Sequence, residues 1–220
     1  SKDLNHVFSF IPGISITDDD THSFIQVING ITGKTCYITY PLNSFKWDNN
    51  KLYLQIGDSL FTDNFIDLNI ENEEIRVSGR LEYSNIVKYP KTFISPGIMG
   101  WYSYIPFMEC KHGIVSVNHK VSGILKIDND IIDMNEGKGY IEKDWGSSFP
   151  ESWIWIQSNN FNNTDTAFTF SVARIPWLGK SFPGFISFLF FDKRFFLFSS
   201  YNNSSLKEIN YDDKTLSFTL

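Results

Sequence analysis

The sequence has no long apolar run and no excess of basic residues, and each shortage excludes a class of protein. Its longest apolar stretch, at 185–191, is interrupted by Ser187 and stopped by Asp192, so it contains no transmembrane segment. The net charge is −6 and the pI is near 5.2. Because no basic stripe is available to neutralise phosphates, we expect no nucleic-acid partner.

Cysteine is also scarce, with only Cys36 and Cys110, far apart in sequence. Two scattered cysteines are more often reduced core thiols than a disulfide, and they offer no zinc-ligand spacing, so no metal is expected. Residues 1–5 are polar and Pro12-Gly13 interrupts the apolar run that follows, so we find no secretory signal. These features predict a cytoplasmic protein, with peripheral contact at a membrane surface as the alternative.

Aromatic residues are abundant instead, at 17% of the chain, including 21 Phe, 10 Tyr and 6 Trp. Together with many Ile, Val and Thr they favour strands over helices. Strand-like runs of similar length alternate with Asn, Asp and Gly turns, and no convincing helix of three turns is present. The residues predict an all-β fold, an antiparallel sandwich or barrel. We expect one β domain over residues 1–220, with an internal boundary near 88–112 if it divides into two β-barrel halves.

Several local features accompany these strands. Ile11-Pro12-Gly13 is expected to form a turn, and hairpin turns are expected at Asp192-Lys193, at Asp212-Asp213, and at Asp128-Asn129 or Asn129-Asp130. The runs 166–182 and 184–201 are apolar enough for strands buried on both faces. Residues 89–112 lack a clean period and are rich in aromatics, which is typical of a lid, a rim or a connection between sheets, or of a hydrophobic plug.

One stretch, 137–161, combines polar and aromatic side chains in two strand-like runs joined by a short turn. Because side chains alternate along a strand, the first run places Tyr140, Glu142 and Asp144 on one face. The second run places a second set on one face, namely Trp153, Trp155, Gln157 and Asn159. If the two runs pair, both sets border a common space, as a pocket for an apolar molecule with one polar end requires.

Three stretches resemble the tocopherol cyclase family: PGIMGWYSYIPFMECKHGIVS (96–116), GKGYIEKDWGSSFPESWIWIQSNNF (137–161) and ARIPWLG (173–179). The resemblance covers most of the chain, from near Pro12 to at least Phe185. It implies a lipocalin-like (calycin) β-barrel or curved β-sandwich holding a lipophilic ligand, and no cofactor. It also implies the activity of the plant members, which close the chromanol ring of a prenylated hydroquinone. The Asn-, Ile-, Lys- and Phe-rich composition does not suggest a plant plastid enzyme, and we expect a bacterial member of the family.

Such a ring closure needs an acid to protonate an alkene, aromatic faces near the resulting cation, and exclusion of bulk water. A carboxyl whose pKa is raised by burial is a suitable acid, and we expect Asp144 to fill this role, with Glu142 second. Tyr140 and the indoles of Trp153 and Trp155 would bind the substrate. Gln157 and Asn159 would orient its hydroxyl groups.

Each assignment has a structural alternative. A carboxylate in a strand is more often ion-paired than catalytic, so either one could instead pair with Arg174. Tryptophans are likewise more often part of core packing than walls that face a cation. Glu109 and His112 fall on opposite faces of a regular strand, so we expect them to make structural hydrogen bonds. We expect His6 and His119 to be surface or turn residues. Three functions follow: an acid-catalysed cyclase (an isomerase) acting on a prenylated or terpenoid substrate, a non-enzymatic carrier of a hydrophobic ligand, or a structural protein whose barrel is filled.

Overall fold

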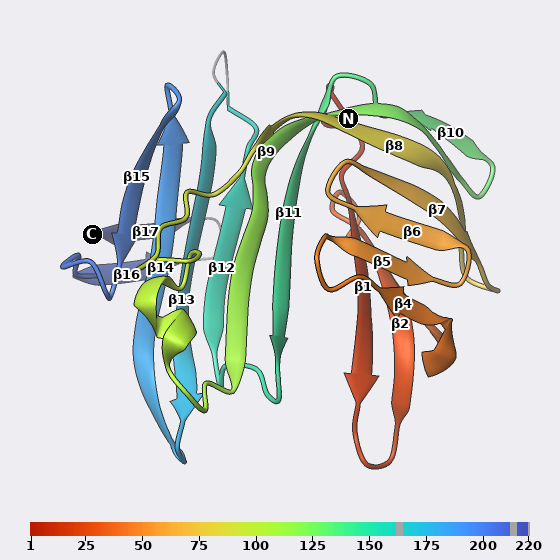
Figure 1. Cartoon of the computed structure of the whole chain (residues 1–220). Coiled ribbons are helices and arrows are strands. Elements are labelled where there is room, and N and C mark those ends of the chain that lie inside the picture. The colour runs from red at the N-terminus through yellow and green to blue at the C-terminus, as the bar shows by residue number, and fades with distance from the viewer. Residues whose placement is uncertain (162–164, 212–214, 220) are drawn as a thin grey trace. The chain divides into compact units, whose positions relative to one another are not determined.

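The computed structural model describes residues 1–161, 165–211 and 215–219, and these are built almost entirely of antiparallel strands (Figure 1). Within the described residues no α-helix occurs, and two short 3-10 helices are present, η1 (Leu42–Ser44) and η2 (Gly100–Tyr104). The predicted all-β class with antiparallel sheets is confirmed. The sheets of the described residues stay open, so the curved-sheet form of the prediction applies rather than a closed barrel.

The chain divides into two compact units. Unit 1 comprises Ser1–Asn85 and His119–Gly139, and unit 2 comprises Ile86–Asn118 and Tyr140–Leu220. Two strands, β9 (Cys110–Ile127) and β11 (Gly137–Gly146), contribute residues to both units. That the units correspond to two barrel halves stays a prediction.

Unit 1 contains a three-stranded sheet and most of a larger one. The first has the order β1-β2-β3, with β1 at Phe8–Ile16, β2 at Thr21–Asn29 and β3 at Thr35–Pro41. The second is a meander that runs through β4 (Phe45–Trp47), β5 (Tyr53–Ile56), β6 (Ser59–Thr62), β7 (Phe65–Glu71), β8 (Arg76–Val87), β9 and β10 (Asp130–Asp133). Alternate side chains from both sheets meet in one core that includes Ile25, Ile56, Leu68 and Leu125.

The predicted turn at Ile11-Pro12-Gly13 is wrong, because β1 runs straight through it. Proline is tolerated there since β1 is an edge strand whose outer side needs no ladder hydrogen bond. Gly13 lies opposite Phe24, and a Cβ at this glycine would come within 2.4 Å of the Phe24 ring. Gly13 is therefore needed to accommodate the aromatic ring of Phe24, and it does not mark a turn.

Two of the predicted hairpin turns are confirmed. Asp128-Asn129 joins β9 to β10, whose Ile127 and Asp130 are register partners. Asp192-Lys193 joins β14 to β15 in the same way. The third predicted turn, Asp212-Asp213, lies outside the described residues.

The reading of His119 as a surface or turn residue is wrong. Its side chain is buried within β9, and its ring centroid lies 4.3 Å from that of Tyr83 on β8. An alternation pattern alone did not reveal this because Val117, Asn118 and His119 are buried in succession.

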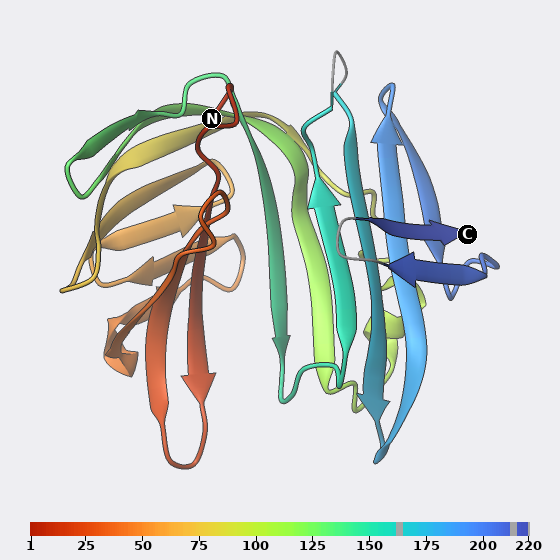
Figure 2. The same cartoon turned by 180° about the vertical axis from the view of Figure 1, so that it is seen from behind.

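Unit 2 is built on a four-stranded sheet of order β12-β13-β14-β15, formed by Trp153–Ser158, Ala167–Trp177, Lys180–Phe191 and Arg194–Ser199. Neighbouring residues of the two central strands are buried together, Thr169 with Phe170 and Ser187 with Phe188, so the middle of these strands is covered on both faces as predicted. The prediction does not hold for β15, where Phe196 and Leu197 are exposed. A short hairpin of β16 (Glu208–Tyr211) and β17 (Leu216–Thr219) lies against β13 (Figure 2). There Phe218 stacks on Phe170, with ring centroids 4.1 Å apart.

The irregular segment 89–112 is partly core and partly surface of unit 2. Tyr89 and Ile98 belong to its hydrophobic core, and the Tyr201 hydroxyl donates a hydrogen bond to the Ile98 carbonyl oxygen. Phe93 and Phe107, in contrast, are largely exposed. A lid or rim function for this segment stays a prediction.

The two runs of the 137–161 stretch are strands, but they do not pair with each other. β11 pairs with β9, whereas β12 pairs with β13. Both views show the N-terminal half of β9 between β11 and β12 within unit 2 (Figures 1 and 2). Side chains from β11 therefore approach those of β12 across β9.

Candidate functional site

A histidine on β9 meets the polar face of β11 inside unit 2. The Nδ1 atom of His112 lies 2.5 Å from Oδ1 of Asp144, and its Nε2 atom lies 3.8 Å from Oε2 of Glu142. The Tyr140 hydroxyl donates a hydrogen bond of 2.7 Å to the same Glu142 oxygen. Strand alternation explains why the three β11 residues share this face. We call His112, Tyr140, Glu142, Asp144 and Trp155 the His112 cluster.

Glu142 has the chemistry expected of a buried acid. Burial is the main cause that raises the pKa of its carboxyl above the ordinary value, and the nearby Asp144 charge adds to it. His112, the Tyr140 hydrogen bond and the Trp155 indole act in the opposite direction without cancelling the effect of burial. The carboxyl of Glu142 thus holds its proton to higher pH than an ordinary glutamic acid.

His112 and Asp144 form a second, more polar part of the cluster. Burial opposes the charged form of His112, but the hydrogen bond to Asp144 and the negative charges of Asp144 and Glu142 raise its pKa overall. The Asp144 side chain is 42% exposed, compared with 25% for Glu142. Asp144 therefore orients the imidazole and favours its protonated form, whereas Glu142 is the less exposed carboxyl.

The β12 and β13 strands supply the other side of this site. Gln157 on β12 and Thr169 on β13 are register partners, and Trp155 lies two residues from Gln157 on the same face. Burial raises the pKa of the Tyr140 phenol, while the nearby Thr169 hydroxyl favours its ionised form. The ring of Tyr140 also packs against the core of unit 2.

Three buried polar atoms in this region make no hydrogen bond of ordinary geometry to any described residue. They are Nε2 of His112, Nε2 of Gln157 and Oγ1 of Thr169. Buried polar atoms normally have partners, so such groups need an explanation. A bound ligand with hydroxyl groups would supply hydrogen-bond partners for them.

The structure brings together most of the residues singled out from the sequence, but two lie apart from the cluster. Trp153 is 58% exposed and its ring lies 6.4 Å from that of Phe149. The Asn159 amide donates a hydrogen bond of 3.3 Å to Asn118. The residues brought together are therefore Tyr140, Glu142 and Asp144 on β11, with Trp155 and Gln157 on β12.

His112 was missed as a member of this site, since its relation to Glu109 pointed to a structural role. Its partners are instead on β11, a strand more than 25 residues further along the chain. Glu109 accepts a hydrogen bond from Ser148. The competing ion pair with Arg174 is absent from the described residues, because Arg174 pairs with Glu151. The only signal available was that His112 lies in one of the family-like stretches.

The described part of the chain shows no group of three His, Cys, Asp or Glu side chains placed to hold a metal ion. Cys36 and Cys110 are both free thiols. None of the helices in that part is long and apolar enough to cross a membrane.

Comparisons with known proteins give both fold and family. The fold matches the crystal structure of a "putative AttH" from Nitrosomonas europaea with a TM-score of 0.53 and 16% identity, covering 96% of this chain and 68% of that one. At this level of identity the likeness concerns the fold alone.

In sequence, the chain is 32% identical over 63 residues to the "Probable tocopherol cyclase, chloroplastic" of rice (Oryza sativa subsp. japonica). It is 34% identical over 62 residues to the "Tocopherol cyclase, chloroplastic" of maize (Zea mays). These stretches cover 29% and 28% of this chain, and 13% of each plant protein. The model of the tocopherol cyclase-like family matches residues 63–210, a span that includes the whole His112 cluster. The chain therefore belongs to the tocopherol cyclase-like family.

Proposed function

We propose that this protein binds an apolar, prenylated or terpenoid molecule beside the His112 cluster and closes a ring on it by acid catalysis, without a cofactor. The observation that carries this proposal is the Glu142 carboxyl. Its side chain is only 25% exposed, its pKa is raised, and it lies beside a phenol and an indole. A carboxyl that keeps its proton in such surroundings is suited to protonate an alkene.

In this proposal Glu142 replaces Asp144 as the proton donor, since Asp144 is hydrogen-bonded to His112 and more exposed. The Glu142 proton passes to the less substituted carbon of a trisubstituted alkene, and a tertiary cation develops on the other carbon. The phenol oxygen of the substrate forms a C–O bond to that cation. The phenolic proton then returns to the Glu142 carboxylate, so the reaction is a net isomerisation.

In this proposal the remaining residues bind the substrate and stabilise the charges that form during the reaction. The indole face of Trp155 is suited to the developing cation, a contact worth about 1–2 kcal/mol when water is excluded. A protonated His112 stabilises the transient Glu142 carboxylate, because its Nε2 atom lies 3.8 Å from Oε2. Gln157 donates a hydrogen bond to a substrate oxygen, which gives its buried amide a partner. Trp153 and Asn159 serve as secondary binding groups in this proposal.

The test is turnover of a prenylated hydroquinone by purified protein in D₂O, followed by chromatography and mass spectrometry. We expect a cyclised product with one carbon-bound deuterium, and loss of turnover in Glu142→Gln. Glu151→Gln is the matched control, because Glu151 is an exposed carboxylate of the same unit, paired with Arg174. Binding is followed by tryptophan fluorescence, so that failure to react is separated from failure to bind.

A non-enzymatic carrier is the competing function. Its specific support is the same set of buried polar atoms without a hydrogen bond of ordinary geometry, which a bound but unreacted ligand would satisfy equally well. Saturable binding without any product, unchanged in Glu142→Gln, would establish the carrier and exclude the cyclase. If neither binding nor turnover is observed, both proposals fail. The remaining hypothesis is then a structural protein whose interior is filled by its own side chains.

A further inference from the structure

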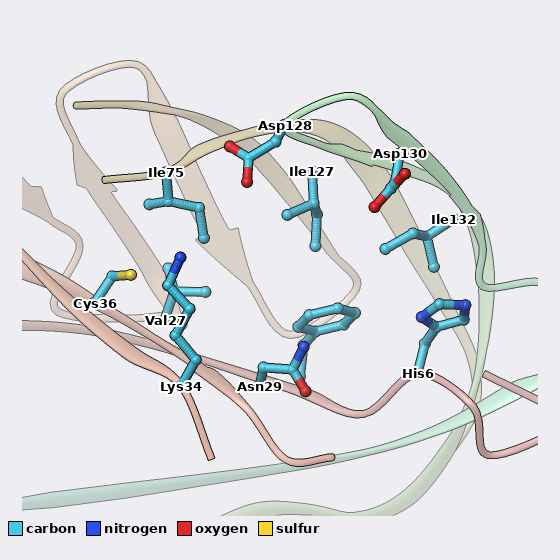
Figure 3. Close-up of a pocket in the computed structure, with 11 residues that line it drawn as sticks. His6, Val27, Asn29, Lys34, Cys36, Ile75, Ile127, Asp128, Asp130 and Ile132 are labelled. Carbon is cyan, nitrogen blue, oxygen red and sulfur yellow. The ribbon is translucent and has the colours of Figure 1, made fainter. Parts of the chain in front are cut away.

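A cavity of about 240 Å³ lies in unit 1, and none of its lining residues belongs to the His112 cluster (Figure 3). It opens where the three-stranded sheet faces the β9–β10 hairpin. Its apolar lining consists of Phe8, Val27, Ile75, Ile127 and Ile132. An engineered apolar cavity of about 150 Å³ holds a benzene ring. This one therefore has room for a ring and a short polar head group.

Charged groups of both signs line the same cavity. Asp128 and Asp130 extend from the β9–β10 hairpin on one side, and Lys34 extends from the turn before β3 on the other (Figure 3). In the described residues Lys34 forms no ion pair with either aspartate. The charges of Lys34 and of the two aspartates are therefore not neutralised by direct ion pairing with each other.

The backbone around these charges is held in place. One Asp128 oxygen accepts a hydrogen bond of 2.9 Å from the Arg76 amide, and Asp130 opens β10 in register with Ile127. The carbonyl oxygen of Lys34 accepts a hydrogen bond of 2.9 Å from the Asn29 amide. The backbone that carries each charged side chain is therefore ordered before a ligand binds. This order reduces the conformational entropy that is lost on binding.

We propose that this cavity is a second ligand site, for a hydrophobic α-amino acid or a zwitterion of similar size. The apolar side chain occupies the space between the two sheets, the carboxylate meets Lys34, and the ammonium meets Asp128 and Asp130. A ligand with one charge satisfies only one wall of the cavity. The zwitterion satisfies both, and this complementarity gives the site its specificity. The inference is independent of the chemistry proposed for unit 2.

The first measurement compares three probes by calorimetry on the full chain: phenylalanine, phenethylamine, which lacks the carboxylate, and 3-phenylpropionate, which lacks the ammonium. We expect phenylalanine to bind about tenfold more tightly than either, the loss of one charge-assisted hydrogen bond. No saturable binding of phenylalanine at millimolar concentrations would overturn the proposal. Equal affinities for phenylalanine and either single-charge probe would also overturn it.

The second measurement assigns each charge to its wall. Lys34→Gln should remove the advantage of phenylalanine over phenethylamine, and Asp130→Asn should reduce its advantage over 3-phenylpropionate. Lys46→Gln and Asp63→Asn are matched controls in unit 1 that lie outside the cavity lining and should change nothing. If Lys34→Gln and Asp130→Asn bind the three probes as the wild type does, the ligand is elsewhere and the proposal is wrong.

A thiol in the cavity lining provides a check of location. Cys36 is one of only two cysteines, so Cys110→Ser leaves it as the single thiol of the chain. Phenylalanine should slow the alkylation of Cys36 in that variant in proportion to site occupancy. An alkylation rate unaffected by saturating phenylalanine would place the ligand outside this cavity.

Discussion

The Nδ1 atom of His112 and the Oδ1 atom of Asp144 lie 2.5 Å apart, joining β9 to β11 in unit 2. This contact fixes the orientation of the imidazole ring, so that its other nitrogen faces Glu142. The three side chains therefore act as a unit. A change at Asp144 reaches Glu142 through His112.

The first prediction concerns Asp144→Asn. This change removes the hydrogen-bonded negative charge that raises the His112 pKa, whereas the burial that lowers this pKa remains. We expect the His112 pKa to fall, as measured by NMR titration of its ring protons. The His112 resonances are assigned by their absence in His112→Gln. An unchanged or higher His112 pKa would show that the contact with Asp144 does not control its charge.

The second prediction concerns the aromatic wall. Trp155→Leu should lower the rate of cyclisation at saturating substrate by about 5- to 30-fold, the equivalent of 1–2 kcal/mol of lost cation stabilisation. Trp155→Phe should lower it less because a ring face remains. Trp47→Leu, at an exposed indole in unit 1, is the control. A Trp155→Leu enzyme as fast as the wild type would remove the indole from the mechanism.

The third prediction concerns the close approach of β8 and β9 in unit 1. A Cβ at Gly79 would come within 2.3 Å of the Ile124 carbonyl oxygen, and its φ of +136° disfavours other residues. Gly79→Ala should therefore destabilise the protein by about 3 kcal/mol in denaturant unfolding. Gly97→Ala is the control, since nothing lies within 4 Å of a Cβ there. Equal stability of the two variants would contradict this reading of β8.

The fourth prediction follows from the burial of His119, which lowers its pKa from 6.5 to about 4. The folded state holds His119 neutral, while the unfolded chain binds a proton below about pH 6.5. Its contribution to stability is therefore complete above pH 6.5 and is lost as the pH falls toward 4. The shift corresponds to about 3 kcal/mol. Wild type should lose more stability than His119→Gln between pH 7 and about pH 4, and equal losses would exclude this role.

The strands were predictable because the sequence alternates and has clear turn signals, as at Asp192-Lys193. Where prediction failed, tertiary contacts had overridden the local pattern. Pro12 and Gly13 look like a turn, but an edge position tolerates the proline and the Phe24 ring requires the glycine. His119 is buried because a neighbouring strand covers it, which no local pattern records.

The sequence predicted the part of the candidate site that lies on one strand, but not the part that depends on strand pairing. Alternation alone grouped Tyr140, Glu142 and Asp144, because all three lie on one strand. It did not identify His112, whose partners depend on the pairing of β9 with β11. Alternation also gave no basis for placing Asp144 before Glu142 as the proton donor. Burial raises the pKa of the Glu142 carboxyl, and burial is a property of the folded chain.

The most direct test of the central claim is the titration of Glu142 itself, by ¹³C NMR of labelled glutamate side chains. The signal is assigned by its absence in Glu142→Gln. We predict that the carboxyl of Glu142 remains protonated at pH values where the side chain of a glutamate in an unstructured peptide is already ionised, because burial raises its pKa. A Glu142 that ionises at the pH of such a peptide would have no proton to give, and would contradict the proposed acid catalysis.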